Sequence, residues 1–181
     1  LKLRPNKEIA ATRPPTSLVF VIDTSGSMYE IVSGETTPTG TTFTQDGKEY
    51  NQVTGGKTKI DIVIESLLAL VRSGKLGTSD RVAIIQFDDS ASQIIGLTQA
   101  TQVDELEKAI AKLSSFSGGT RMGLGLRHAL DSLSDEDMSV RRILLFTDGE
   151  TFDEDVCRDI ASDFAAQNIP ITASGVGEDF K

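Results

Sequence analysis

S-L-V-F-V-I-D-T-S-G-S-M, residues Ser17 to Met28, is the stretch from which the fold of this chain can be inferred. Its apolar residues form an unbroken run, without the alternation of a strand that has one face in water. A strand buried on both faces of a parallel sheet has this pattern. The run ends at Asp23, and small hydroxylated residues follow. Because ligands of open α/β sheets bind beyond the carboxyl ends of the strands, Asp23, Ser25 and Ser27 are expected at a binding site.

Strand and helix patterns alternate along the rest of the chain. Short apolar runs predict further strands at 81–87, 91–97, 140–147 and 169–173. Apolar residues at helical spacing predict helices at 57–72, 103–113, 121–133 and 153–167. The short turn at Asp88-Asp89-Ser90 makes its two flanking strands an antiparallel pair. The sequence therefore predicts an α/β, Rossmann-like fold: a doubly wound, mostly parallel sheet with helices on both faces and one antiparallel edge strand.

Two segments lie outside this alternation. Residues 1–16 contain prolines and isolated charges and are expected to form an extended lead-in to a domain at 17–181. Residues 33–58 are expected to be an insertion, in which the Thr/Gly/Pro-rich part at 34–42 is loop and Asp46-Gly47 is the turn of a β-hairpin. The insertion would stand near the end of the first strand. It either selects partners or covers the site, or it is a hairpin without a role in binding.

Charge and composition narrow the classes of function. A net charge of −9 argues against nucleic acid as a partner, since an acidic chain repels phosphate backbones. No apolar stretch approaches the roughly 20 residues of a membrane helix, so no direct membrane insertion is expected. The single cysteine, Cys157, fits a reducing compartment and favours the cytoplasm over the cell surface. The start, Leu1-Lys2-Leu3, has neither an initiator Met nor a signal peptide, which indicates a fragment of a longer protein.

Two later stretches strengthen the pattern Asp-x-Ser-x-Ser at 23–27, which is weak by itself. Ser117-Gly118-Gly119-Thr120 precedes a helical pattern, and I-L-L-F-T-D-G at 143–149 is a second apolar strand that ends in a carboxylate. In this order, the three segments resemble the metal-ion-dependent adhesion site of the von Willebrand factor type A (VWA) domain family. The resemblance covers roughly residues 17–177. It implies the fold of that family, whose sheet has a sixth strand and further helices; this last unit is expected either to lie outside the given sequence or to be missing from the domain.

The resemblance implies a complete metal site of five side chains: Asp23, Ser25, Ser27, Thr120 and Asp148. Oxygen ligands suit Mg²⁺, Mn²⁺ or Ca²⁺ rather than zinc. By resemblance, the two serine hydroxyls bind the ion directly, Thr120 binds directly or through water, and the two aspartates act mainly through water. Neutral ligands leave the charge of the ion poorly compensated. An Asp or Glu carboxylate of a protein partner is therefore expected to complete the coordination.

Other polar residues have simpler interpretations. Asp88 and Asp89 are expected to form a turn, and Asp153 with its acidic neighbours is expected to start a helix, so none of them is a predicted metal ligand. His128 lies within a helical pattern and is expected at the surface or in packing, and Cys157 is expected to be buried or inert. No nucleophile motif accompanies either residue, so the chain is not expected to be an enzyme.

Three functions remain open at this stage. The first is a metal-dependent protein-binding module of the prokaryotic type, serving either as an adaptor of an AAA+ ATPase or in adhesion. The second is a Mg²⁺-dependent, phosphatase-like hydrolase, although the haloacid dehalogenase pattern requires an Asp where this chain has Ser25. The third is a structural VWA domain that keeps the motif without using metal. The sequence names neither a partner nor an oligomeric state.

Overall fold

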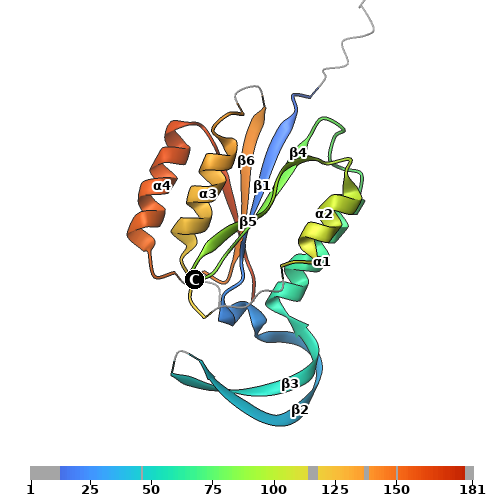
Figure 1. Cartoon of the computed structure of the whole chain (residues 1–181), viewed down its shortest axis with the longest axis vertical. Coiled ribbons are helices and arrows are strands. Elements are labelled where there is room, and N and C mark those ends of the chain that lie inside the picture. Colours follow the sequence, from blue (N-terminus) through green and yellow to red (C-terminus); the bar gives the residue numbers. More distant parts are fainter. Residues whose placement is uncertain (1–12, 46, 114–117, 137–138, 150, 178–181) are drawn as a thin grey trace, which may run out of the picture.

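A single sheet forms the centre of the molecule. The computed structural model describes residues 13–45, 47–113, 118–136, 139–149 and 151–177. Within them the main sheet has five strands in the order β5-β4-β1-β6-β7, and a separate two-stranded sheet is formed by β2 and β3. The described residues therefore combine a central sheet with one projecting hairpin, as Figure 1 shows.

The strand that contains the apolar run lies in the middle of the main sheet. β1 (Thr16–Asp23) pairs in parallel with β4 (Arg81–Phe87) on one side and with β6 (Val140–Thr147) on the other. β7 (Ile171–Gly175) continues the parallel arrangement beside β6, and β5 (Ala91–Gln99) is antiparallel to β4 at the opposite edge. The predicted fold class, including its antiparallel edge strand, is confirmed.

Helices cover both faces of this sheet. α1 (Lys59–Arg72) and α2 (Val103–Ile110) lie on one face, and α3 (Met122–Leu133) and α4 (Glu154–Ala166) lie on the other (Figure 1). Within the described residues, none of the helices has the length and apolar character needed to cross a bilayer. The helices thus form the outer layers that an unbroken apolar strand requires.

The side chains of β1 divide between two hydrophobic cores. Leu18, Phe20 and Ile22 pack into the core beneath α1 and α2. Val19 and Val21 point the other way, into the core beneath α3 and α4. All five are buried because successive side chains of a strand alternate between faces that are both covered. This double burial fixes the position of the residue at the end of the strand.

The start of α1 corrects the predicted boundary by two residues. The helix begins at Lys59 rather than Lys57, because Thr58 is its N-cap. The Thr58 hydroxyl accepts a hydrogen bond from the Asp61 N–H, and the Asp61 carboxylate accepts one from the Thr58 N–H, which together form a capping box. The helix therefore starts directly where the hairpin ends.

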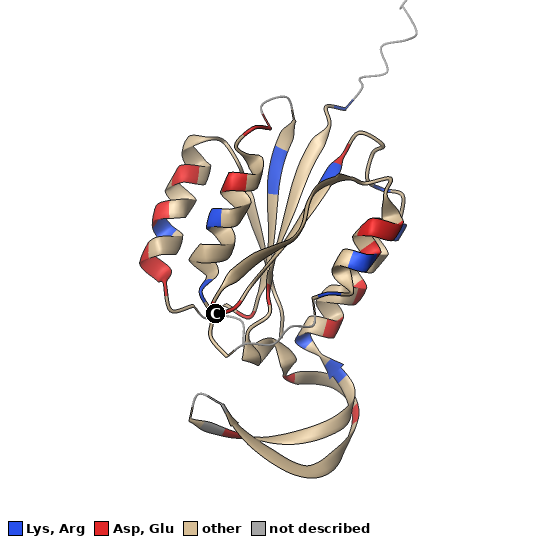
Figure 2. Ribbon diagram, viewed as in Figure 1, with Lys and Arg blue, Asp and Glu red and all other residues tan. Residues whose placement is uncertain are grey.

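The hairpin consists of two long strands, β2 (Ile31–Gln45) and β3 (Lys48–Thr58), with Asp46 outside the described residues. The prediction of a loop over 34–42 is wrong, because these residues belong to β2 and pair with β3 across several register shifts. β-branched threonines favour extended backbone, and glycines such as Gly34 (φ 92°) accommodate the irregularities. Figure 2 shows few charged residues on the hairpin compared with α2 and α4.

Replacement of Gly125 tests the packing of α3 against the sheet. A Cβ at this position would lie 2.8 Å from Phe87 Cδ1 and 3.0 Å from Val21 Cγ1, both in buried side chains. We expect Gly125→Ala to lower the free energy of unfolding by about 1–2 kcal/mol, although alanine gains about 1 kcal/mol of helix propensity. Urea unfolding measures this, with Ala69→Gly on the exposed face of α1 as the calibration of the propensity term. A stabilised Gly125→Ala variant would contradict the described packing.

Candidate metal centre

The candidate site lies at the carboxyl edge of the main sheet. Asp23 is the last residue of β1, and Asp148 directly follows β6, the parallel neighbour of β1. Ser25 and Ser27 lie on the loop after β1, at the start of the short 3₁₀ helix η1 (Gly26–Tyr29). Parallel pairing brings the ends of β1 and β6 together, so residues far apart in the sequence meet at one edge.

Asp23 is completely buried and holds this edge together. Its Oδ1 accepts a hydrogen bond from the Ser25 N–H (2.9 Å), and its Oδ2 accepts one from the Thr147 hydroxyl (2.7 Å). Burial raises the pKa of Asp23 to about 6, and the negative charge of Asp148 adds to this increase. The hydrogen bonds from Ser25 and Thr147 lower the pKa but do not outweigh burial. The two aspartates are therefore close enough for their charges to interact.

The remaining candidate metal ligands at this edge are oxygen atoms without a full set of hydrogen-bond partners. Ser25 Oγ and Ser27 Oγ lie 3.2 Å apart. Asp148 Oδ1 is buried and finds no hydrogen-bond partner in the part of the chain that the structure describes. Over the same residues, no three side chains of His, Cys, Asp and Glu are grouped as metal ligands, so an ion here would need the hydroxyls as well. This set of oxygen ligands fits Mg²⁺, Mn²⁺ or Ca²⁺.

Thr120 is tied through its backbone to the loop that follows Asp148. Its carbonyl accepts hydrogen bonds from the Phe152 N–H (2.9 Å) and the Thr151 hydroxyl (3.2 Å), in the loop that follows Asp148. The next residue, Arg121, donates its N–H to the carbonyl of Asp88 (2.8 Å), at the end of β4. Thr120 is thus buried between the loops after β4 and β6. Ser117, from the same motif, lies outside the described residues.

Asp88 forms the predicted turn, whereas Asp89 has a role that sequence reasoning missed. Asp88 Oδ1 accepts hydrogen bonds from the N–H (2.8 Å) and hydroxyl (3.0 Å) of Ser90. Asp89 Oδ2 accepts the N–H of Gly119 (3.0 Å), the residue before Thr120. A Cβ at Gly119 would lie only 1.8 Å from Asp89 Oδ1. Asp89 therefore positions the Gly-Gly-Thr loop, and the glycine is needed for this close approach.

Asp153 likewise does more than start its own helix. It occupies the N-cap position of α4, but its side chain accepts the N–H of Gly123 at 3.1 and 3.3 Å, in the first turn of α3. Thr151 accepts the N–H of Met122 (3.1 Å) and donates its hydroxyl to Asp153 (2.6 Å). The prediction that Asp153 starts its own helix is confirmed, and its side chain in addition caps the neighbouring helix, which begins directly after the Thr120 loop.

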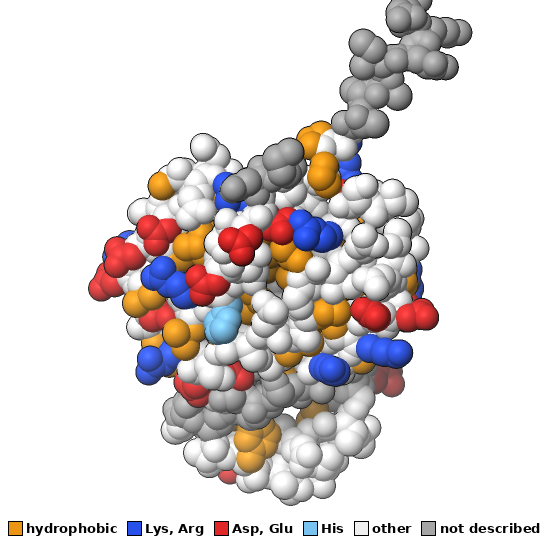
Figure 3. Space-filling view, turned by 45° about the horizontal axis from the view of Figure 1, so that its top comes forward, with side chains coloured by type: hydrophobic (Ala, Val, Ile, Leu, Met, Phe, Trp, Pro, Cys, Tyr) orange, Lys and Arg blue, Asp and Glu red, His pale blue; other side chains and the backbone are white. Residues whose placement is uncertain are grey.

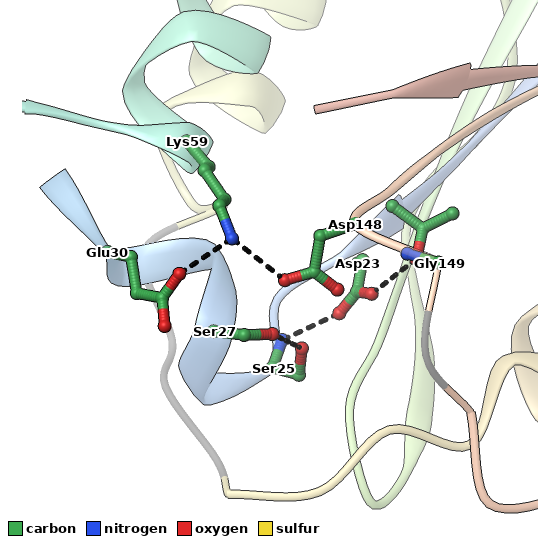
Figure 4. Close-up of polar contacts among 8 residues, drawn as sticks. Asp23, Ser25, Ser27, Glu30, Lys59, Asp148 and Gly149 are labelled. Carbon is green, nitrogen blue, oxygen red and sulfur yellow. Dashed lines mark hydrogen bonds and ion pairs between the residues drawn. The ribbon is translucent and has the colours of Figure 1, made fainter. Parts of the chain in front are cut away.

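Lys59 is a further residue of the site that sequence reasoning missed. Its side chain is 6% exposed, and its ammonium donates to Glu30 Oε2 (2.7 Å) and Asp148 Oδ2 (3.2 Å), as Figure 4 shows. Burial lowers the pKa of Lys59, but the hydrogen bonds and charges of Glu30 and Asp148 outweigh it and leave the pKa above its usual value. One feature of the sequence indicates a special role for Lys59: it is a lysine at the start of a helix, where the helix dipole disfavours a cation.

The two residues considered for nucleophilic chemistry lie elsewhere. His128 is exposed on α3. Cys157 is half-buried on α4, and burial together with the charge of Asp153 raises the pKa of its thiol to about 11. A thiol with this pKa is protonated at neutral pH and is a poor nucleophile.

A groove separates the hairpin from the rest of the domain. It has a volume of about 770 Å³ and is lined by η1, the first residues of α1 and the inner side of the hairpin. Phe43 and Tyr50 stack on each other there, with ring centroids 5.5 Å apart, and Phe43 is 45% exposed. Gly26, on the loop between the two site serines, also lines the groove. Figure 3 shows hydrophobic side chains at this end of the molecule beside the hollow.

Comparison with known sequences finds one family over almost the whole chain. The profile of the von Willebrand factor type A domain matches residues 17–181. Matrilin-1 of Bos taurus is 28% identical over 172 residues, which are 90% of this chain and 26% of matrilin-1. Matrilin-3 of Gallus gallus is 22% identical, and 33% of its length is covered. The chain thus spans between a quarter and a third of these curated relatives.

Solved structures with the same fold are more distant in sequence. Proximal thread matrix protein 1 from the mussel byssus superposes with a TM-score of 0.68 at 19% identity, over 93% of this chain and 38% of that protein. Manganese-loaded TRAP protein of Plasmodium vivax superposes with a TM-score of 0.63 at 17% identity, over 93% of this chain and 59% of that one. At these identities the likeness shows the fold alone.

The pKa of Asp23 predicts how the stability of the metal-free protein depends on pH. Because its folded-state pKa of about 6 exceeds its ordinary value of 3.8, the folded protein holds this proton more tightly than the unfolded chain. The resulting penalty is absent below about pH 4, grows up to about pH 6 and is complete above it. Relative to the parent, Asp23→Asn should therefore gain about 2–3 kcal/mol of unfolding free energy between pH 4 and pH 7.

Urea unfolding of both proteins in a chelating buffer across this range gives the difference directly. The difference between variant and parent cancels the contributions of the other titrating carboxylates to the unfolding free energy. One of these is Asp80, whose pKa is lowered although burial alone would raise it. A difference that stays constant with pH would show that Asp23 is not under this strain.

Proposed function

Because the chain belongs to the von Willebrand factor type A domain family, we propose that it is a protein-interaction module that binds an acidic residue of a partner through a divalent cation. The cation would be Mg²⁺ or Mn²⁺, held at the carboxyl edge of the main sheet. One observation carries the proposal. Asp148 has a buried carboxylate oxygen without a partner among the described residues, at the edge where two serine hydroxyls lie 3.2 Å apart.

Each residue of the site has a distinct role in this proposal. Ser25 and Ser27 would hold the ion directly through their hydroxyls, and Thr120 would complete the set of protein ligands. Asp23 keeps both oxygens engaged with Ser25 and Thr147, so it orients the serine loop and supplies negative charge. Asp148 contributes its unpartnered oxygen, directly or through water. A bound ion would supply an open coordination position for a carboxylate oxygen.

Charge explains why the partner group would be acidic. The hydroxyl ligands are neutral, and one of the two carboxylates is already paired with Lys59. The site therefore compensates a divalent charge incompletely, and an additional anionic ligand is favoured. The manganese-loaded relative TRAP supports a divalent ion in this fold, although its identity to this chain is only 17%.

The hairpin is proposed to select among acidic partners. The groove beside it reaches Gly26 on the metal-binding loop, so a chain segment whose carboxylate meets the ion can continue over Phe43 and Tyr50. These stacked rings offer apolar surface to side chains next to the acidic residue. Affinity for the ion and selectivity for the partner would then come from different parts of the chain.

Loss of a serine hydroxyl tests the metal site. We expect calorimetric titration with Mn²⁺ to detect one site in the parent and at least a tenfold weaker one in Ser25→Ala, because a direct ligand is lost. Ser66→Ala, which removes an exposed hydroxyl on α1, should bind Mn²⁺ like the parent. Circular dichroism should show all three proteins folded. Equal Mn²⁺ binding by Ser25→Ala and the parent would refute the assignment.

Removal of the aromatic pair tests the role of the hairpin. A phage-displayed random peptide library is selected in Mn²⁺ and, as a control, in chelator. The parent should enrich peptides with an Asp or Glu next to apolar residues. Phe43→Ala combined with Tyr50→Ala should retain the acidic residue and lose the apolar preference, with Mn²⁺ affinity within twofold of the parent. If the same peptides were enriched by both proteins, the hairpin would have no part in selection.

A further inference from the structure

A lysine ammonium lies inside the proposed metal site. Lys59 is the first residue of α1, and its side chain bridges Asp148, directly after β6, and Glu30, directly before β2 (Figure 4). We propose that Lys59 is a fixed positive charge that weakens binding of the ion alone and strengthens binding of an acidic partner to the filled site. This inference rests on the proposed metal site and assigns its specificity for carboxylates to one residue.

The position of Lys59 is fixed by packing. Its side chain is 6% exposed, and its Cε lies close enough to Gly177 that a Cβ there would be 2.8 Å away. Its backbone N–H donates to the carbonyl of Glu30 (3.1 Å), so both the main chain and the side chain of Lys59 are held at the foot of the hairpin. The ammonium therefore cannot leave Asp148 without breaking several contacts.

The charges around the site then determine how strongly it binds the ion alone and how strongly the filled site binds an acidic partner. Asp23 and Asp148 together neutralise a divalent ion, and the Lys59 ammonium adds one positive charge. Glu30 offsets this charge only in part because its carboxylate is half-exposed and screened by water, so the filled site keeps a local positive excess. Repulsion between this ammonium and the ion acts in a buried region where charges are weakly screened. The same positive excess attracts a carboxylate from outside. Lys59 therefore links two binding events. A bound ion favours binding of the partner carboxylate, and a bound carboxylate favours binding of the ion.

Glu30 has the opposite effect on the same site. Its carboxylate lies 2.7 Å from the Lys59 ammonium, and its side chain is half-exposed. It therefore reduces the positive charge that the ion meets. Because Glu30 directly precedes β2, the hairpin carries a residue that tunes the metal site, in addition to the groove that it forms.

Two substitutions separate this charge effect from a structural one. Lys59→Met and Glu30→Gln both break the ion pair at the foot of the hairpin. If the pair only anchors the hairpin, the two variants should change Mn²⁺ affinity in the same direction. If charge decides, they should act in opposite directions: Lys59→Met should bind Mn²⁺ on the order of tenfold more tightly, and Glu30→Gln several-fold more weakly.

The experiment is a Mn²⁺ titration of the full chain, followed by calorimetry, with and without sodium acetate at constant ionic strength. Acetate serves as the carboxylate probe. It should increase Mn²⁺ affinity in the parent and do so much less in Lys59→Met. Lys57→Met is the matched control, because Lys57 has the same charge and pairs with Glu65 on the exposed surface. It should remain within twofold of the parent in both buffers.

Each outcome is decisive. Opposite shifts, with acetate dependence lost in Lys59→Met, support the proposal. Two results would overturn this inference but leave the proposed metal site intact. In the first, Mn²⁺ binding requires Ser25 but has the same affinity in Lys59→Met as in the parent. In the second, Lys59→Met and Glu30→Gln both lose Mn²⁺ affinity. Absence of Mn²⁺ binding in every protein, Lys59→Met included, overturns the metal site itself. If Lys59→Met does not fold, Glu30→Gln decides through both readouts: weaker Mn²⁺ binding with a larger effect of acetate than in the parent supports the proposal, and unchanged or tighter binding, or an unchanged effect of acetate, overturns it.

Discussion

Two carboxylates, Asp23 and Asp148, are buried at the ends of neighbouring parallel strands, and the rest of the site is arranged around their negative charge. Burying a carboxylate is costly unless hydrogen bonds or a cation compensate it. Asp23 is compensated by hydrogen bonds from Ser25 and Thr147, yet its pKa still rises to about 6. Asp148 is compensated by Lys59 on one oxygen only. The proposed cation would supply what these contacts leave unbalanced.

A rigid scaffold keeps these charges in place. β1 is buried on both faces, so its last residue has little freedom. The loops around it are tied to one another by contacts across the sheet edge, from Asp89 to Gly119 and from Asp153 to Gly123. Each of these carboxylates accepts a backbone N–H that a loop or helix start would otherwise leave unpaired. Support of this kind keeps ligand side chains positioned before a ligand arrives.

Local patterns were enough to predict the fold and the strand ends at which the site lies. The apolar run before Asp23 and the run before Asp148 mark strands covered on both faces, and this signal is contained in the runs themselves. The roles of Lys59 and Asp89 depend on partners tens of residues away, which no local pattern encodes. The glycines and Pro38 of segment 34–42 predict a loop, which the structure contradicts. These residues form part of β2 instead, because they pair with β3 and because threonine favours extended backbone.

The central claim is that one divalent ion binds at the end of β1, and anomalous diffraction from crystals grown with Mn²⁺ tests it most directly. The account predicts one manganese peak within coordination distance of the Ser25 and Ser27 hydroxyl oxygens, on the side of Asp148 Oδ1. Its sixth position should be taken by water or by a carboxylate of a neighbouring molecule. A peak at another cluster of acidic residues, or no peak at this edge in saturating Mn²⁺, would contradict the account.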